Sequence, residues 1–170
     1  MKKYELVKVE NSSLYRIKAL KDFADIKAGD LGGWIESEHN LSQEGDCWIY
    51  DGAIVCDRAI VLDDARIYNK AIVCDRAAVW GKAIVRDHAI VSGSALVKHD
   101  AIIKDNAIVK DRAVVKGCAI LKDKAVIQDN SAIMDHACIE GNITLADNVV
   151  VKGNVSITGS GTISGELEIG

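Results

Sequence analysis

The sequence predicts an all-β protein built as a parallel β-helix, in which short strands stack coil upon coil. From Cys47 to Glu166 the chain divides into twenty consecutive six-residue repeats, here called hexads, with no insertion between them. The third place of every hexad is Ile, Val or Leu, and the fifth place is always Asp, Gly, Asn or His. A short and strict period of this kind is typical of repeat proteins with stacked coils.

Each hexad is expected to form a short strand followed by a bend. The first place is Ala in fourteen of the fifteen hexads from Ala53 to Ala137, with Ser131 as the exception. Alternate side chains of a strand point to opposite faces, so the first and third places are expected inside and the variable second place, which begins with Trp48, outside. The fifth place is Asp eleven times, Gly seven times, and Asn69 and His99 once each. These residue types tolerate positive φ or bond their own backbone, which predicts the bend.

The hexads resemble those of the bacterial hexapeptide-repeat transferase family. The resemblance covers Leu41 to Gly170 and implies a left-handed parallel β-helix with three hexads, or 18 residues, in each triangular coil, hence about seven coils. The handedness comes from this resemblance alone. A lag of 18 residues within the chain supports the coil size, because Cys56–Ala59 reads CDRA and Cys74–Ala77 reads CDRA again.

The first 40 residues lack the repeat and are expected to form a cap, so we divide the chain into a cap at 1–40 and a β-helix at 41–170. KYELVKV and LYRIKAL alternate in polarity around Asn11, which predicts a β-hairpin. Gly29, Gly32 and Gly33 are expected in tight turns. This leader, with KAGDLGGWIESE, is similar to that of the YdcK-like subgroup of prophage and enterobacterial proteins. The resemblance implies a phage or prophage origin.

Composition excludes several classes of function. The net charge of −4 argues against a general nucleic-acid-binding protein, which would be basic. No signal peptide follows Met1, and no apolar run is long enough to cross a membrane. Five cysteines without a secretory signal favour free thiols in a reducing compartment, so we expect the protein in the cytoplasm of a bacterial host cell.

Apolar residues at the outward second place predict contacts between subunits. On adjacent coils these residues would stack into vertical rows, here called ladders. Monomers rarely leave a large apolar patch exposed, so we expect a homotrimer in which these ladders are buried. The alternative is simple β propensity on a tolerant surface. The expected interface residues are Ile54, Ile72, Ile90 and Ile108 on one face and Ile84, Ile102 and Ile120 on another.

The family's acyltransferases use a catalytic His in a cleft between subunits. If this chain were such an enzyme, the resemblance would imply His99 or His136 as that residue. His99 occupies a fifth place that is otherwise Asp, Gly or Asn, and His136 lies two coils further along the same corner. No insertion interrupts the hexads to supply the substrate loops usual in the family, so we favour a solvated corner His over a catalytic one. A zinc site of three His is disfavoured, because His88 lies on a different corner.

Two corner ladders predict an anion site. In it, aromatic rings would stack on a base and cations would contact phosphate. The alternative is a solvated surface in which neighbouring Asp residues neutralise the ladders. The expected ligand-binding residues are Tyr68, Trp80, Arg86, Lys98, Lys104 and Lys116. Cys56 and Cys74 should also stack on adjacent coils, within reach of a disulfide, although two reduced thiols are favoured.

Unbroken hexads and apolar outer faces favour a non-catalytic oligomeric binding or scaffold protein without a cofactor. In the phage context implied by the resemblance, it would sequester a host protein or a small anionic nucleotide in counter-defence. The first alternative is a hexapeptide-repeat acyltransferase that uses acyl-CoA. The second is a structural element of a phage particle.

Overall fold

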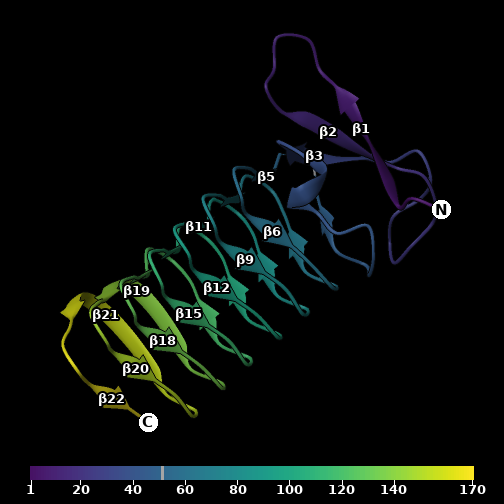
Figure 1. Cartoon of the computed structure of the whole chain (residues 1–170). Helices are drawn as coiled ribbons and strands as arrows, with labels where there is room; N and C mark the ends of the chain where they lie inside the picture. Colours follow the sequence, from purple (N-terminus) through teal and green to yellow (C-terminus); the bar gives the residue numbers. More distant parts are fainter. Residues whose placement is uncertain (51) are drawn as a thin grey trace.

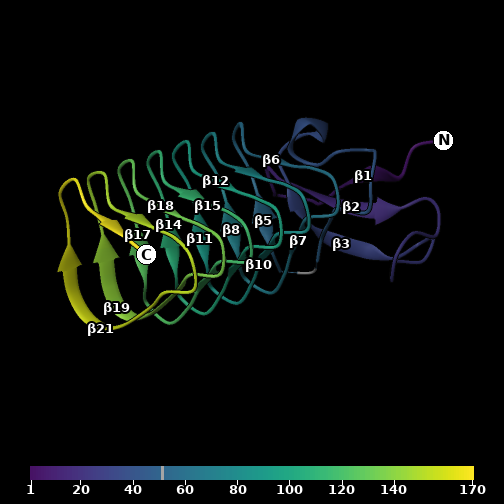
Figure 2. The same cartoon turned by 90° about the horizontal axis from the view of Figure 1, so that it is seen from below.

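The computed structural model describes residues 1–50 and 52–170, and it is all-β apart from one 3-10 helix, η1 (Glu38–Asn40). Its body is a parallel β-solenoid of about eight turns, seen as successive coils in Figures 1 and 2. A hairpin of β1 (Tyr4–Lys8) and β2 (Tyr15–Ala19) lies at the N-terminal end. This is close to the predicted left-handed β-helix with a hairpin cap. Among the residues described, no helix has the length and apolar character needed to span a membrane.

The solenoid has three faces, each a column of strands paired in parallel and named here after one outward residue. The Ile84 face comprises β4 (Trp48–Ile49), β7 (Arg66–Ile67), β10 (Ile84–Val85), β13 (Ile102–Ile103) and β16 (Ile120–Leu121). The Ile54 face comprises β3 (Leu31–Ile35), β5 (Ile54–Val55), β8 (Ile72–Val73), β11 (Ile90–Val91), β14 (Ile108–Val109) and β17 (Val126–Ile127). The longer strands β19 (Cys138–Leu145) and β21 (Ser156–Ile163) continue both of these faces around their shared corner. The Ile60 face comprises β6 (Ile60–Val61), β9 (Ala78–Val79), β12 (Leu96–Val97), β15 (Val114–Val115), β18 (Ala132–Ile133), β20 (Val150–Val151) and β22 (Glu168–Ile169).

The coil length of 18 residues is confirmed by the strand register. Ile54 pairs with Ile72, and Ile84 pairs with Ile102, each residue lying beside the equivalent one in the next coil. Backbone hydrogen bonds repeat the same step, as when the N–H of Ile54 donates to the carbonyl of Ala71 at 3.0 Å. Each coil therefore donates N–H groups to the coil that follows it.

The interior contains the side chains expected there. First- and third-place residues between Ala53 and Ile139 are at most 1% exposed, so small Ala and branched side chains together fill a narrow core. Trp48 is an exception to the prediction that second-place residues lie outside, because it is only 1% exposed. The rings of Tyr4 and Phe23 from the leader pack edge-on against it, with centroids 6.3 and 5.4 Å away.

The predicted bends are confirmed by backbone geometry. Every fifth-place residue that the structure describes has positive φ, between 57° and 65° for those other than Gly. The Asp side chains add a second set of contacts at these corners. The carboxylate of Asp63, for example, accepts the backbone N–H of Gly81 at 3.1 Å, and that of Asp105 accepts the N–H of Asp123 at 3.2 Å. These Asp contacts, here called the Asp ladder, link bends that carry Asp to the next coil.

Strand β3 joins the leader to the solenoid and adds the extra turn. It pairs antiparallel with β2 and parallel with β5. Gly29 lies in a turn with φ of 98°, as expected, but Gly32 and Gly33 lie inside β3, so the prediction of turns there is wrong. A Cβ on Gly33 would be 2.5 Å from the carbonyl oxygen of Tyr50. Both glycines are therefore needed for close approach of two backbones.

The leader also supplies hydrogen-bond donors to the first coil. In the solenoid, each backbone carbonyl accepts an N–H from the preceding coil. The first coil has no preceding coil, so its carbonyls need donors from elsewhere. The buried Nζ of Lys3 donates to the carbonyls of Glu44, Gly45 and Cys47 at 3.0–3.2 Å. The amide of Asn40 donates to the carbonyl of Ala59 at 2.9 Å. Lys3 is only 1% exposed, and this burial lowers the pKa of its ammonium group.

Candidate functional site

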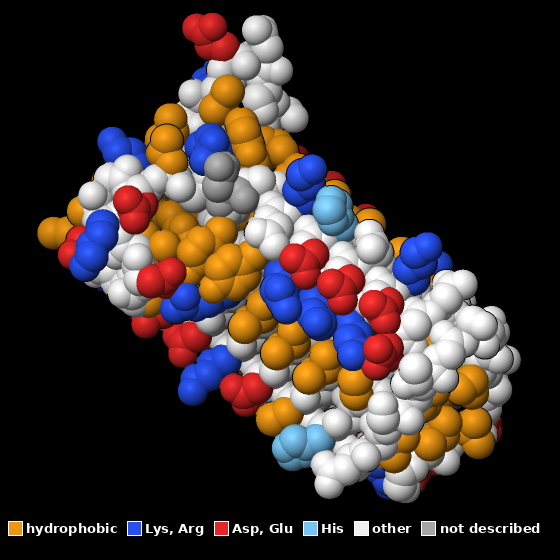
Figure 3. Space-filling model, turned by 180° about the vertical axis from the view of Figure 1, so that it is seen from behind, with side chains coloured by type: hydrophobic (Ala, Val, Ile, Leu, Met, Phe, Trp, Pro, Cys, Tyr) orange, Lys and Arg blue, Asp and Glu red, His pale blue; other side chains and the backbone are white. Residues whose placement is uncertain are grey.

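The Ile84 face is an apolar strip with charged edges. Its floor consists of the half-buried Ile84, Ile102 and Ile120, which lie beside one another on consecutive coils. Figure 3 shows this side of the molecule, where rows of apolar side chains run beside a column of Lys and Arg. Fourth-place residues border one edge of the strip, namely Tyr68, Arg86, Lys104 and Lys122. Sixth-place residues border the other edge, namely Asp64, Lys82, Asp100, Cys118 and His136.

A hydrogen-bonded group closes the N-terminal end of the strip. Nη1 of Arg66 donates to Asp25 at 2.6 Å and to the hydroxyl of Tyr50 at 2.7 Å, and that hydroxyl donates to Asp25 at 2.9 Å. The ring of Tyr50 stacks on Tyr68 with centroids 4.1 Å apart. Burial, Tyr68 and the Asp25 carboxylate raise the pKa of Tyr50. Partial burial acts to raise the pKa of Asp25, but the hydrogen bonds from Tyr50 and Arg66 outweigh it and lower that pKa.

Sequence reasoning did not identify this group as part of a site. One signal was available, because Arg66 carries the only charge found at the second place before Glu168. Its partner Asp25 lies in the leader, 41 residues away and outside the periodic pattern. The pairing therefore follows from the docking of the leader and not from the repeat.

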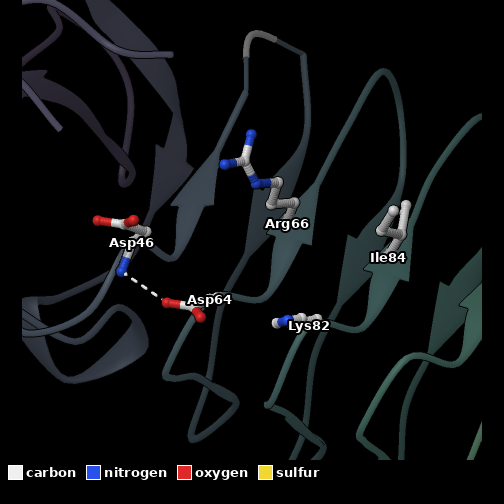
Figure 4. Close-up of a pocket in the computed structure, with 5 residues that line it drawn as sticks. All are labelled: Asp46, Asp64, Arg66, Lys82 and Ile84. Atoms are coloured by element: carbon white, nitrogen blue, oxygen red, sulfur yellow. Dashed lines mark hydrogen bonds between the residues drawn. The ribbon is translucent and has the colours of Figure 1, made fainter. Parts of the chain in front are cut away.

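Two shallow depressions lie on the strip. The first, of about 310 Å³, is lined by Asp46, Asp64, Arg66, Lys82 and Ile84. In Figure 4 the guanidinium of Arg66 points away from Asp64 and Lys82, in keeping with its bonds to Asp25 and Tyr50. The second, of about 380 Å³, is lined by Tyr68, Asn69, Ile84, Arg86 and Ile102. Because Ile84 lines both, the depressions adjoin.

The cations beside the second depression have acidic neighbours. Arg86 lies 3.6 Å from Asp87, and Lys104 lies 3.9 Å from Asp105. Such long, solvent-accessible ion pairs hold a side chain weakly. Lys122 lies 2.8 Å from Glu140, and the hydrogen bond with that carboxylate raises the pKa of Lys122. Arg86 and Lys104 are therefore the more available cations on this edge.

The six predicted ligand-binding residues fall into two groups. Tyr68, Arg86 and Lys104 border the Ile84 face as described. Trp80, Lys98 and Lys116 are fourth-place residues of the Ile60-face hexads, on the corner at the end of that face. There Nζ of Lys98 lies 5.0 Å from the centre of the Trp80 ring, a cation–π contact.

The two candidate histidines have different surroundings. His99 has φ of 61°, and its Nδ1 accepts the backbone N–H of Gly117 at 3.4 Å. His99 therefore accepts a backbone hydrogen bond from the next coil, as Asp does at the neighbouring bends. The centre of its ring lies 6.2 Å from that of the Trp80 ring. His136 is exposed at the edge of the Ile84 face, one coil beyond Cys118. Of the two, His136 occupies the sixth place, which borders the apolar strip.

The predicted interface residues are all half-buried within the single chain. The third face is apolar at the same place, since it presents Ile60, Leu96 and Val114. Apolar second-place residues thus occur on all three faces. Apolar character alone therefore does not identify which face would form a subunit interface. The five cysteines are free thiols.

Comparison with curated proteins gives a partial match. No protein-family model matches the chain. The chain is 47% identical over 58 residues to a protein of Escherichia coli (strain K12) described as an uncharacterized acetyltransferase, YdcK. The matched segment is 34% of this chain and 18% of that relative, so the match covers less than a fifth of the relative's length. The solenoid and this match together fit a hexapeptide-repeat transferase family.

Proposed function

We propose that the protein is an acyltransferase of the hexapeptide-repeat type, with acyl-CoA as donor and the Ile84 face as the donor-binding surface. The observation that carries the proposal is the 47% identity over 58 residues to a protein named as an acetyltransferase. That match favours the acyltransferase alternative over the non-catalytic scaffold role first expected. Neither a phage role nor sequestration of a host protein gains support from the comparisons.

The chemistry of the strip suits such a donor. Coenzyme A joins an anionic, phosphate-bearing nucleotide to an extended and largely uncharged arm. Arg86 and Lys104 would contact the phosphates through charge-assisted hydrogen bonds. Tyr68 would stack on the adenine, and the arm would lie along Ile102 and Ile120 towards the C-terminal end of the strip. This assignment uses three of the predicted ligand residues and leaves Trp80, Lys98 and Lys116 without a role in donor binding.

His136 is the proposed general base. It lies two coils beyond Lys104, about 10 Å along the solenoid axis at ~4.8 Å for each coil. The acceptor hydroxyl or amine attacks the thioester carbonyl carbon while the imidazole of His136 takes the proton of the attacking atom. The C–S bond then breaks, and the departing CoA sulfur receives that proton. His99 is not assigned this part, because its Nδ1 already accepts a backbone hydrogen bond.

Activity tests this proposal directly. Purified protein is incubated with acetyl-CoA and a panel of small amines and alcohols, and free CoA is measured by chromatography. We expect CoA release that depends on an acceptor and falls at least ~100-fold in His136→Ala, the usual loss for a general base. His39→Ala is the matched control, since His39 is an exposed leader residue. Failure of acetyl-CoA both to bind and to be consumed would exclude the proposal.

The proposal includes a homotrimer in the bacterial cytoplasm, where free thiols persist. Neighbouring copies would cover part of the apolar ladders, including Ile54 and Ile90. Sedimentation velocity at micromolar concentration should give the mass of three chains, and Ile90→Asp should shift it towards one. A wild-type monomer under these conditions would contradict the trimer. It would not decide donor binding, which the acetyl-CoA assay tests.

A further inference from the structure

A second cluster of reactive side chains lies on a different corner, between the Ile54 and Ile60 faces. The tripeptide Cys-Asp-Arg occurs there on two consecutive coils, at residues 56–58 and 74–76. The backbone brings the two copies into register, because the N–H of Cys56 donates to the carbonyl of Val73 at 3.1 Å. The N–H of Asp75 in turn donates to the carboxylate of Asp57 at 3.2 Å. Two thiols and two carboxylates are thus stacked one above the other.

The possible ligand atoms converge. One oxygen each from Asp57 and Asp75 and the sulfur of Cys74 all lie within 4.8 Å of one another, the one such group of three found among residues 1–50 and 52–170. The sulfur of Cys56 lies 3.4 Å from the carboxylate of Asp57. Three ligand atoms from two coils therefore lie close together on the surface, and the sulfur of Cys56 lies beside one of them.

The surroundings hold this group in place. Glu36 of the leader accepts the backbone N–H of Asp57 at 2.6 Å, which fixes the upper bend. The carboxylate of Asp75 accepts the N–H of Gly93 at 2.8 Å, which fixes the lower one. Both Asp residues accept these backbone hydrogen bonds through Oδ2. The cluster adjoins an open depression of about 440 Å³ lined by Glu36, Asp57, Arg58, Asp75 and Arg76, so an ion has access to it.

We propose that Cys56, Asp57, Cys74 and Asp75 form a binding site for a borderline-soft divalent cation of the zinc type. Two sulfur and two oxygen ligands suit tetrahedral Zn²⁺, with bonds of about 2.3 Å to sulfur and 2.0–2.2 Å to oxygen. Magnesium and calcium would take oxygen ligands throughout, which this group does not offer. The spacing of adjacent coils brings the two copies of the Cys-Asp-Arg tripeptide together within one chain.

Cobalt(II) provides the test, because it takes the place of zinc and absorbs light. Reduced, chelator-stripped protein is titrated with Co²⁺ under anaerobic conditions. We expect one ion per chain, a near-ultraviolet thiolate-to-metal charge-transfer band, and loss of the band when Zn²⁺ is added. Cys56→Ser and Cys74→Ser should each weaken the band and lower Co²⁺ affinity at least ~10-fold. Asp57→Asn and Asp75→Asn should lower affinity too, while Asn tolerates the positive φ of the bend.

Cys118→Ser is the matched control, because Cys118 is exposed on another corner beside His136. The proposal is overturned if Co²⁺ produces no thiolate band, if the band survives in the Cys56→Ser, Cys74→Ser double variant, or if Cys118→Ser removes it. Circular dichroism of each variant establishes that the solenoid is intact. The outcome is independent of the acyltransferase proposal, which concerns the Ile84 face.

Discussion

Nδ1 of His99 accepts the backbone N–H of Gly117, so an imidazole occupies a place that carboxylates fill at neighbouring bends. Its bond is 3.4 Å long, whereas Asp135 on the same corner accepts the N–H of Gly153 at 2.9 Å. We therefore expect His99→Asp to stabilise the protein by about 0.5–1 kcal/mol, because it restores a shorter, charge-assisted bond. His99→Ala should destabilise it by about 1–2 kcal/mol, since Ala has no acceptor and is strained at positive φ.

Urea unfolding measures both variants, and acyl transfer is assayed beside it. Retention of transfer in His99→Asp is expected from a structural His. Loss of acyl transfer in His99→Asp, with its unfolding free energy unchanged or increased, would indicate that His99 takes part in the reaction.

Lys3 is expected to contribute more to stability than its surface neighbour Lys2. Lys3→Met removes the donor shared by three carbonyls of the first coil and should cost about 3 kcal/mol. Lys2 forms an exposed ion pair with Glu38, so Lys2→Met should change the unfolding free energy by less than about 0.5 kcal/mol. Equal losses in the two variants, measured by urea unfolding, would contradict the role given to Lys3.

The hydroxyl of Ser131 is buried and has no hydrogen-bond partner among residues 1–50 and 52–170. It occupies a first place that is Ala in the hexads around it, so Ser131→Ala should stabilise the protein by about 1–2 kcal/mol through removal of an unsatisfied polar group. The exposed Ser94 provides the control, and Ser94→Ala should be neutral within about 0.5 kcal/mol. A loss of stability in Ser131→Ala would mean that the hydroxyl has a partner in solution.

These three positions show how far the repeat alone predicts the structure. The inside, outside and bend places follow from the hexad, because one pattern of side chains meets the same surroundings in every coil. Lys3, Asp25 and the burial of Trp48 do not follow from it, since they depend on how a non-periodic leader folds back on the first coil. The hydrogen bond that His99 accepts from Gly117 was not predicted either, because the sequence favoured a solvated corner His without a backbone partner.

Alkaline pH should reveal the burial of Tyr4. Its hydroxyl donates to the carbonyl of Leu41 at 2.6 Å, and burial raises its pKa above the ordinary value of 10.0. The folded protein thus keeps the phenol proton where the unfolded chain loses it. The contribution to stability is full below pH 10 and is lost as pH rises through the higher, folded pKa. Unfolding free energy should therefore fall above pH 10, and less steeply in Tyr4→Phe. Parallel pH profiles for the two proteins would contradict this.

Acetyl-CoA binding, followed by calorimetry, tests the central claim that the Ile84 face accepts the donor. The Arg86→Glu, Lys104→Glu double variant should bind acetyl-CoA at least ~10-fold more weakly than wild type, because two phosphate contacts are lost. The Lys110→Glu, Arg112→Glu variant changes charge equally at the corner between the Ile54 and Ile60 faces and should bind like wild type. Equal weakening in both variants, or none in the first, would show that the donor does not lie on this face.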